Sequence, residues 1–214
     1  MEEIVNKWNT IKSNLKLKHG SFNEEVPEQL MAVRYLTGNE KVLEIGGHFG
    51  RNSLIIASIT NTLVTLECNK NVFKQLQENI DLNNVNFFIE NSALSLRKIV
   101  QKEEGGVTVP YEQYSDKNFI EVNSITLSEL KAKYPIDFDT LVLDCEAAFY
   151  YILIDMPEIL NGINLIIMEN DYLNISEKIY VDTVLKENGF YRDYVEAGGW
   201  QPCYDFFYEV WKRN

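Results

Sequence analysis

The sequence predicts an α/β fold, with a doubly wound, mostly parallel sheet that ends in a C-terminal antiparallel β-hairpin. Three observations lead to this fold class. Short apolar runs alternate with segments of helical periodicity along most of the chain. The first apolar run leads directly into a glycine-rich turn, and the last two are joined by a loop without a helix between them. Apolar strands alternating with helices are typical of a parallel sheet covered on both faces, and two runs joined by a loop are typical of a hairpin.

The chain begins with a helical segment. Apolar and charged positions alternate at helical spacing over residues 1–19, and the same periodicity returns over 26–36. We therefore expect a single domain over residues 1–214, in which a helical segment at 1–38 precedes an α/β core at 39–214.

The first half of the core alternates regularly. Continuous apolar runs predict strands at residues 41–45, 62–66 and 85–89. Between them, apolar residues at helical spacing predict helices at 53–58 and 72–82.

The second half of the core starts with a polar segment at residues 101–123, which we interpret as a surface loop or a small hairpin. Helical spacing then predicts helices at 126–134 and 150–160, the second of them interrupted by Pro157. A buried strand is expected between them at 139–143.

The end of the chain departs from the alternation. A strand at residues 165–168 and a helix at 175–188 continue the earlier pattern. Two strand-like runs follow at 190–195 and 204–211, joined by a loop that contains two glycines. These runs predict the terminal antiparallel hairpin.

Composition and charge narrow the class of protein. Hydrophobic residues make up 45% of the 214 residues and charged residues 24%, as in soluble globular proteins. The net charge of -12 argues against a nucleic-acid partner, because such binding depends on neutralising phosphates. The three cysteines form no CxxC pair, and we find neither a leader-like apolar run nor a membrane-spanning stretch. We expect a cytoplasmic protein with no membrane partner, and the sequence leaves its oligomeric state open.

A glycine-rich turn, EIGGHFG over residues 44–50, follows the first predicted strand. Glycines at the carboxyl end of such a strand allow a ligand to approach the backbone closely. The turn does not match the dinucleotide pattern GxGxxG, which fails at His48 and Arg51, and no phosphate-binding GK[ST] loop is present. Glu67 ends the second strand, where a carboxylate can accept both hydroxyls of a ribose. The pattern indicates a ligand that contains a nucleoside, but it does not identify which ligand.

Four motifs at strand ends together resemble a known family. They are VLEIGGHFGRNS, VTLECNK, IENSALS and LVLDCEAAF, and a TLSEL segment lies ahead of the last. This set resembles the class I S-adenosylmethionine-dependent methyltransferases, which have a Rossmann-like fold, and most closely their FkbM-type branch. Glu44 stands where that branch has Asp, and Ala147 and Phe149 replace its Gly and second acid.

The resemblance implies S-adenosylmethionine as the cofactor and assigns residues to its parts. Its methionine end would lie against Glu44, Gly46, Gly47 and Gly50. Glu67 would accept the ribose hydroxyls, and Asn91, Ser92 and Ala93 would border the adenine. Asp144 would face the sulfonium.

Methyl transfer to a hydroxyl requires a base for the hydroxyl proton. The candidates are Asp144, His48 and Glu146, with Glu169 as a further carboxylate. His48 has a reference pKa of about 6.5, which suits a base at neutral pH. It is equally well interpreted as a turn residue that stacks beside the cofactor or bonds to the backbone.

A second resemblance concerns the ends of the fourth and fifth strands of the core. In catechol-type O-methyltransferases an acid and an Asp-Asn pair at these positions hold a divalent cation. Here Asp144 ends one strand, and Glu169, Asn170 and Asp171 end the next. Oxygen ligands of this kind suit Mg²⁺ or Mn²⁺. The alternative is an acidic edge that caps a helix and is solvated.

The family resemblance also implies an acceptor. FkbM-type enzymes are commonly O-methyltransferases, so we expect methylation of a hydroxyl of a sugar or glycan. Aromatic residues that are expected near the site could pack on a sugar face: Trp200, Tyr204, Tyr111 and Tyr114. The alternatives are another small molecule or a protein as the acceptor, or a catalytically inactive S-adenosylmethionine-binding module.

Overall fold

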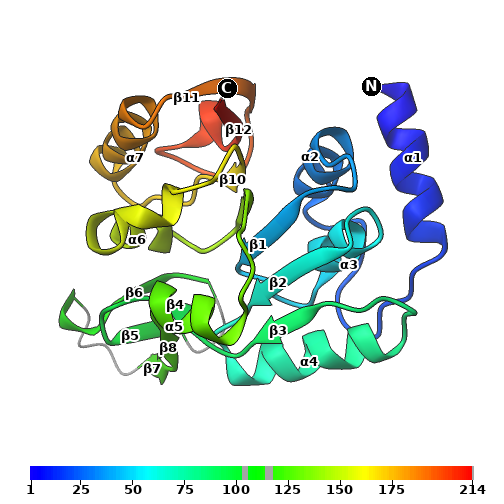
Figure 1. Cartoon of the computed structure of the whole chain (residues 1–214), viewed down its shortest axis with the longest axis horizontal. Helices are drawn as coiled ribbons and strands as arrows, with labels where there is room; N and C mark the ends of the chain where they lie inside the picture. The colour runs from blue at the N-terminus through cyan, green and yellow to red at the C-terminus, as the bar shows by residue number, and fades with distance from the viewer. Residues whose placement is uncertain (103–105, 114–117, 214) are drawn as a thin grey trace.

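The computed structural model describes residues 1–102, 106–113 and 118–213. At its centre is a seven-stranded sheet in the order β11-β12-β10-β9-β1-β2-β3 (Figure 1). The strands of this sheet are β1 (Lys41–Ile45), β2 (Thr62–Leu66), β3 (Phe88–Glu90), β9 (Thr140–Leu143), β10 (Leu165–Glu169), β11 (Phe190–Glu196) and β12 (Tyr208–Arg213). The five strands from β3 to β10 pair in parallel, and β12 pairs antiparallel with both β10 and β11. The predicted fold class, including the terminal hairpin, is confirmed.

The helices follow the predicted order with small shifts at their ends. They are α1 (Glu2–Ser13), α2 (Val26–Tyr35), α3 (Arg51–Ala57), α4 (Lys70–Asp81), α5 (Leu127–Lys133), α6 (Ala148–Asp155) and α7 (Ile175–Glu187). The helix expected at 150–160 ends at Asp155, and a 3₁₀ turn, η2 (Pro157–Leu160), replaces its last part because proline lacks the N–H that would continue the helix. Within the described residues, we find no helix with the length and apolar character needed to cross a membrane.

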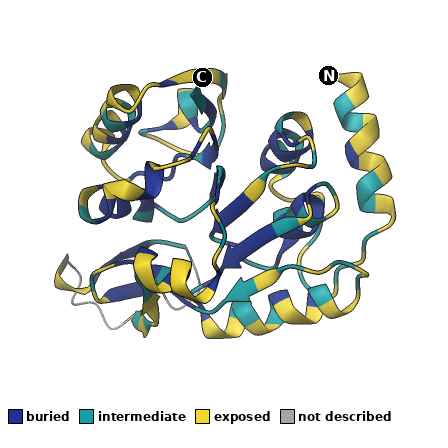
Figure 2. Cartoon of the chain, in the orientation of Figure 1, coloured by how far each residue is buried: buried dark blue, intermediate teal, exposed yellow. Residues whose placement is uncertain are grey.

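The two faces of the sheet are covered by different helices. Leu43 and Leu141 belong to a core cluster that also contains residues of α5, α6 and α7. Val42 and Val142, whose side chains point the opposite way along the same strands, pack with residues of α2 and α3. The central strands are accordingly buried while the outer sides of α1 and α4 are exposed (Figure 2).

The N-terminal helix α1 lies at one side of the molecule and packs on α2 and α3 (Figure 1). Its buried Trp8 packs with Val33 and Ile55. The indole Nε1 of Trp8 donates a hydrogen bond of 2.9 Å to Oε1 of Gln29 on α2. The helical segment ahead of the sheet is therefore fixed to the core.

The polar segment at residues 101–123 contributes to a small antiparallel sheet. β5 (Ile99–Lys102) lies between β6 (Thr108–Pro110) and β7 (Phe119–Val122). The β5–β6 pair is the small hairpin that we considered, and β7 adds a third strand. Two short strands, β4 (Ala93–Leu94) and β8 (Ser124–Ile125), pair in parallel before and after it.

The last strand begins later than its apolar pattern predicts. A 3₁₀ turn, η3 (Tyr204–Phe206), occupies the start of the predicted run. Asn170, just after β10, donates its backbone N–H to the Phe207 carbonyl at 2.8 Å and its side-chain Nδ2 to the Phe206 carbonyl at 2.7 Å. These carbonyls are thus bound to the end of β10, and pairing with β11 starts only at Tyr208.

A buried ion pair joins β12 to α7. Glu209, which is fully buried, accepts a hydrogen bond from Lys178 Nζ at 2.9 Å and another from Arg192 Nη1 at 2.8 Å. The indole Nε1 of Trp211 also donates to Glu209, at 2.9 Å. Removal of one partner of such a pair leaves a buried charge uncompensated.

We expect Glu209→Gln to lower the free energy of unfolding by about 3 kcal/mol, because Lys178 keeps only the partly exposed Asp182 as an anionic partner and Arg192 loses its partner. Urea denaturation followed by circular dichroism measures this change. The matched control is Glu121→Gln, which removes an exposed ion pair with Lys98 and should have little effect. Equal effects of the two substitutions would contradict the expectation.

Candidate functional site

A cavity of about 290 Å³ opens at the carboxyl ends of the parallel strands. Its walls come from the turn after β1, the ends of β2, β9 and β10, the segment after β3, the small sheet and the terminal hairpin. This is the edge at which open parallel sheets bind their ligands. Its volume is close to the lower end of the range for small-molecule sites.

The turn after β1 requires glycine because it passes very close to β9. The backbone of Gly46 has a φ of +96°, and a Cβ at this position would lie 1.6 Å from the carbonyl oxygen of Asp144. A Cβ on Gly47 would lie 2.2 Å from the Thr65 methyl group. The amides of both glycines donate to the Leu66 carbonyl, at 3.0 and 2.9 Å. The turn therefore lies in close contact with the ends of both neighbouring strands, β9 and β2.

Glu44 supports this turn and does not line the cavity. Its side chain is buried, and Oε2 accepts hydrogen bonds from Ser53 Oγ at 2.5 Å and from Thr65 Oγ1 at 2.7 Å. Burial raises the pKa of Glu44 to about 7, and the charges of Asp144 and Glu67 add to this. Glu44 therefore ties α3 to β2, and its predicted contact with the cofactor stays a prediction.

Glu67 lines the cavity and is held in place by backbone groups. Its Oε2 accepts from the amide of His48 at 2.9 Å, and its Oε1 accepts from the amide of Asn69 at 2.7 Å. Asn91 in turn donates to the Glu67 carbonyl at 2.8 Å. Burial raises the pKa of Glu67 to about 7. Each carboxylate oxygen keeps capacity for one more donor.

The structure brings together most of the residues that the sequence singled out. Those that line the cavity are Gly46, His48, Glu67, Ser92, Ala93, Asp144, Glu146 and Glu169. The other members of the predicted cofactor set, which do not line it, are Glu44, Gly47, Gly50 and Asn91.

The turn after β9 is strained. Glu146 and Ala147 have φ values of +52° and +70°, a conformation that suits glycine and is unfavourable for residues with a Cβ. Glu146 lines the cavity, and burial together with the charge of Asp144 raises its pKa to about 7. Phe149, at the position where the FkbM-type resemblance predicts an acid, is buried in the core. Ala147 therefore adopts here a backbone conformation that is more usual for glycine.

His48 lies in the glycine turn with a φ of +46°. Its ring is 3.9 Å from the ring of Phe49, centroid to centroid, and burial lowers its pKa. The lowered pKa favours the neutral imidazole, in which one ring nitrogen is an acceptor in either tautomer. This geometry is compatible with both interpretations of His48, as a base and as a turn residue.

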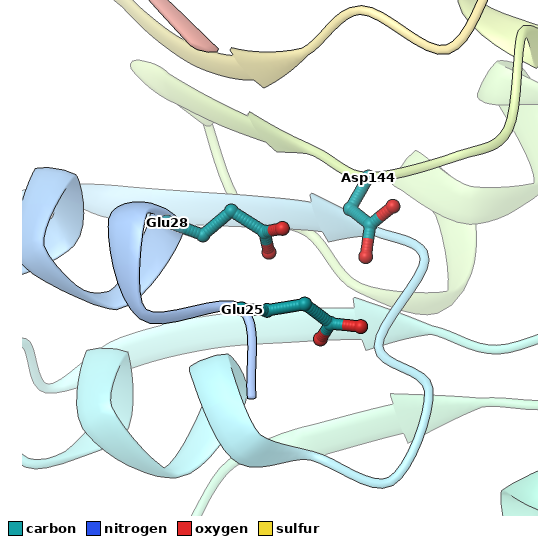
Figure 3. Close-up of side chains that lie close together, drawn as sticks. All are labelled: Glu25, Glu28 and Asp144. Atoms are coloured by element: carbon teal, nitrogen blue, oxygen red, sulfur yellow. The ribbon is translucent and has the colours of Figure 1, made fainter. Parts of the chain in front are cut away.

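Five carboxylates lie in two groups beside the cavity, and we call Glu25, Glu28, Asp144, Glu169 and Asp171 the acidic cluster. One oxygen from each of Glu25, Glu28 and Asp144 lies within 4.8 Å of the others, and these three side chains point toward one another (Figure 3). The same holds for the oxygens of Asp144, Glu169 and Asp171. Asp144 thus belongs to both groups.

Burial raises the pKa values of Glu28, Asp144, Glu169 and Asp171. The pKa of Asp144 rises to about 6, although the charge of Arg51 opposes the shift. Burial also raises the pKa of Glu28 and Asp171 well above their usual values, and that of Glu169 rises for the same reason and because of its contact with Glu28. Without a cation, several of these carboxyls therefore keep a proton at neutral pH.

The predicted metal set is brought together in part. Asp144 and Glu169 lie close together, and the third carboxylate beside them is that of Asp171. Asn170 uses its Nδ2 to bind the Phe206 carbonyl, while its buried Oδ1 has no hydrogen-bond partner among the described residues. Its role as a metal ligand stays a prediction.

Aromatic side chains of the terminal hairpin form the wall beside Glu169. Tyr208 pairs with Glu169 across the β10–β12 ladder. Trp200 and Phe207 also line the cavity, with their rings 5.1 Å apart in an edge-on arrangement. Trp200 is half exposed, so a ligand can reach its ring.

Of the four aromatic residues predicted near the acceptor, Trp200 alone lies on the cavity wall in the part of the chain that the structure describes. Tyr111 and Tyr204 are exposed and do not line the cavity. Tyr114 lies outside the described residues.

Several residues of the cavity wall and of the acidic cluster escaped the sequence analysis. Glu25 and Glu28 begin α2, far along the chain from the strands they approach, and acids in the first turn of a helix are normally interpreted as capping groups. Gln101 and Thr108 belong to the small sheet, which carries no motif. Phe207 lay within an apolar pattern that indicated only a strand.

Comparisons with known proteins agree with this geometry. No protein-family model and no curated protein matches the sequence. Among solved structures, the ribosomal protein L11 methylase of Lactobacillus delbrueckii subsp. bulgaricus is 14% identical, with a TM-score of 0.56 over 92% of this chain and 82% of that one. A putative O-methyltransferase from Klebsiella pneumoniae is also 14% identical, with a TM-score of 0.56 over 100% of this chain and 89% of that one. A putative RNA methyltransferase from Pyrococcus horikoshii is 9% identical, with a TM-score of 0.55 over 100% and 98%.

The chain has the Rossmann-like fold of these methyltransferases. Identities this low establish the fold alone. The names of the three proteins include a ribosomal-protein methylase, an O-methyltransferase and an RNA methyltransferase, so the fold does not select an acceptor.

The raised pKa of Glu44 predicts how stability depends on pH. The folded protein keeps the Glu44 proton up to about pH 7, whereas the unfolded chain loses it near its usual pKa of 4.5. The unfolded state then binds fewer protons, so the free energy of unfolding falls as the pH rises between these values. We expect Glu44→Gln to remove about 1 kcal/mol per pH unit from this slope between pH 5 and 7. Urea denaturation at several pH values measures it, and an unchanged slope would show that Glu44 is ionised in the fold.

Proposed function

We propose that the protein is an S-adenosylmethionine-dependent O-methyltransferase that acts on a hydroxyl of a sugar or glycan. The observation that carries the proposal is the position of Glu67 on the cavity wall, fixed by the amides of His48 and Asn69. A carboxylate held in this way, beside a glycine turn in this fold, suits the two hydroxyls of a ribose.

The rest of the cavity also fits the cofactor. Ser92, Ala93, Asp144 and the Gly46 turn all line the cavity. In the proposed arrangement Ser92 and Ala93 contact the adenine, while Asp144 and the Gly46 turn contact the methionine end and the sulfonium. When bound, S-adenosylmethionine supplies an electrophilic methyl group on a positively charged sulfur. The carboxylates around the cavity favour a cation there, because opposite charge lowers the cost of its desolvation.

The chain's own contribution is to position the acceptor and to receive its proton. An acceptor oxygen held in line with the methyl group would displace the sulfur from the methyl carbon, and a residue of the chain would take up the hydroxyl proton. Asp144, His48 and Glu146 all line the cavity and can accept it. The pKa values of Asp144 and Glu146, raised to about 6 and about 7, lie near neutral pH, and the lowered pKa of His48 favours its neutral form, which can accept a proton.

The acceptor side supports a hydroxylated ligand. The ring of Trp200 offers a surface for the apolar face of a sugar, and Glu146 and Glu169 offer acceptors for its hydroxyls. The same carboxylates and the net charge of -12 disfavour nucleic acid, whose phosphates they would repel. Two alternatives are that the acceptor is another small molecule or a protein, and that the chain is an inactive cofactor-binding module. Turnover assays distinguish these alternatives from methylation of a sugar.

Glu67→Ala should weaken binding of S-adenosylhomocysteine by about 1–3 kcal/mol, because the ligand loses a buried hydrogen-bond acceptor. Calorimetric titration measures this, with Glu121→Ala as the surface control. Circular dichroism confirms that both variants are folded. An intact, folded wild type that does not bind S-adenosylhomocysteine would refute the cofactor assignment.

Trp200→Ala should raise KM for a sugar acceptor about three- to tenfold and leave the affinity for S-adenosylhomocysteine unchanged, because the ring contacts the acceptor alone. The measurement is transfer of a labelled methyl group to a panel of mono- and oligosaccharides. Tyr204→Ala is the matched control, since Tyr204 is exposed on the same hairpin and does not line the cavity. Cofactor binding with no transfer to any member of a panel extended to amines and proteins would indicate an inactive module.

A further inference from the structure

Asp171 is a buried carboxyl group without a hydrogen-bond partner. Its side chain is 4% exposed, and neither of its carboxylate oxygens accepts a hydrogen bond from a donor of the described residues. One of these oxygens lies within 4.8 Å of oxygens of both Asp144 and Glu169, so the side chain is directed into the acidic cluster. A buried acceptor without a donor is costly, and it is typical of a site that the donor of a ligand completes.

The carboxylates around Asp171 are not balanced by basic side chains. In the described part of the chain, no lysine, arginine or histidine forms an ion pair with Asp144, Glu169 or Asp171. Arg51, whose charge acts on Asp144, is bonded to two glutamates of the N-terminal segment instead. In the free protein, protons on carboxyls with raised pKa values reduce the repulsion between them. A cationic group of a ligand can take the place of these protons.

The position of these carboxylates in the sheet places such a cationic group on the acceptor side. The strand ends around the cavity follow in the order β10-β9-β1-β2. In the proposed arrangement the cofactor extends from Glu67 at β2 to the Gly46 turn at β1, and its sulfonium faces Asp144 at β9. Glu169 and Asp171 lie at the end of β10 and just after it, one strand farther from the cofactor. Their charge is therefore available to the acceptor.

The wall of the terminal hairpin beside Glu169 is aromatic. Trp200, Phe207 and Tyr208 line the same cavity as Glu169, and Trp200 is half exposed. The face of an aromatic ring attracts a cation, and a carboxylate forms a charge-assisted hydrogen bond with a cationic donor. The wall thus combines the two kinds of group that bind an organic cation, and its rings can also pack on the apolar face of a sugar.

The spacing of the carboxylates fits a protonated primary amine. This group carries three N–H donors in a tetrahedral arrangement. At charge-assisted N···O distances of about 2.8 Å, three acceptors around it are separated by about 4.6 Å. Oxygens of Asp144, Glu169 and Asp171, all within 4.8 Å of one another, can therefore receive one hydrogen bond each. Asp144 and Glu169 line the cavity, so the amine can reach them from the ligand side.

We propose that Asp144, Glu169 and Asp171 bind the protonated amine of the acceptor, and that the acceptor is an amino sugar. This inference rests on the proposed function and names the class of sugar. An ammonium group held by carboxylates keeps its proton and has no lone pair with which to attack a methyl group, so a neighbouring hydroxyl is the nucleophile. Glu146 and His48 are then the candidates to take up the proton of that hydroxyl.

Transfer of a labelled methyl group to pairs of sugars tests the site. The pairs are glucosamine, galactosamine and their oligomers, each beside its N-acetylated form, at a pH at which the free amine is protonated. We expect a kcat/KM at least about tenfold higher for the amino sugar of a pair, because only this form makes the charged hydrogen bonds. Fragmentation in mass spectrometry should place the methyl group on oxygen.

Asp171→Asn should raise KM for the amino sugar at least about tenfold, because it removes one of three charged acceptors, and should leave the affinity for S-adenosylhomocysteine within about twofold. The matched control is Asp205→Asn, since Asp205 is an exposed aspartate of the same terminal hairpin and does not line the cavity. The control makes the same change in net charge and should leave KM within about twofold. Circular dichroism establishes that each variant is folded, and Glu169→Gln replaces Asp171→Asn if that variant is not.

Preferred transfer to the N-acetylated sugars would overturn the proposal, as would a methyl group found on nitrogen. An effect of Asp171→Asn no larger than that of Asp205→Asn would overturn it as well, because it would indicate a general effect of charge. Loss of transfer on addition of EDTA would do the same, since it would indicate a metal ion in place of the amine.

Titration with S-adenosylhomocysteine separates the amine site from the proposed function. A folded wild type that does not bind S-adenosylhomocysteine contradicts the proposed function. Cofactor binding with transfer to neutral sugars alone contradicts only the amine site, and cofactor binding without transfer to any sugar contradicts both.

Discussion

The close approach of the Gly46 turn to the end of β9 is the constraint on which the site depends. β1 and β9 are neighbours in the sheet, and the peptide of Asp144 occupies the space where a side chain at position 46 would lie. The two strand ends can meet at this distance only because one of them carries no Cβ. Asp144 is thereby fixed beside the turn, and Glu67 is fixed from the other side by the amide of His48. The glycine turn therefore sets the separation between the carboxylates of the cavity as well as the backbone path.

Burial of several carboxyl groups at one place lowers the stability of the fold. Desolvation dominates the pKa shifts of Glu28, Asp144, Glu169 and Asp171, and non-glycine residues at the cavity edge adopt left-handed backbone conformations. Both features cost free energy in the absence of a ligand. Such costs are typical of sites whose ligand compensates them, and they concentrate here at the edge of the sheet where ligands bind.

The sequence was sufficient for those parts of the structure that depend on local patterns. Glu67 and Asp144 could be predicted as site residues because each directly follows an apolar run that marks a strand. The glycine turn at the end of the first strand showed which edge of the sheet binds the ligand. Glu28 was missed because its place in the acidic cluster results from packing between α2 and a strand more than a hundred residues later in the chain. Phe149 lies in the core, so the sequence pattern that predicted an acid at this position does not describe the cavity of this chain. Contacts of this kind are decided by tertiary packing, which periodicity does not encode.

The contribution of α2 to the acidic cluster has a consequence for how the protein is made. Glu28 leaves the ribosome early, whereas Asp171 is synthesised only when most of the chain has emerged. The helical segment must therefore wait for β9 and β10 before its buried carboxylate has neighbours, and the contact between them is of high sequence separation. Folding intermediates that contain only the first half of the sheet would leave Glu28 solvated and ionised. The acidic cluster is therefore completed only after the strands β9 and β10 have been synthesised, long after Glu28.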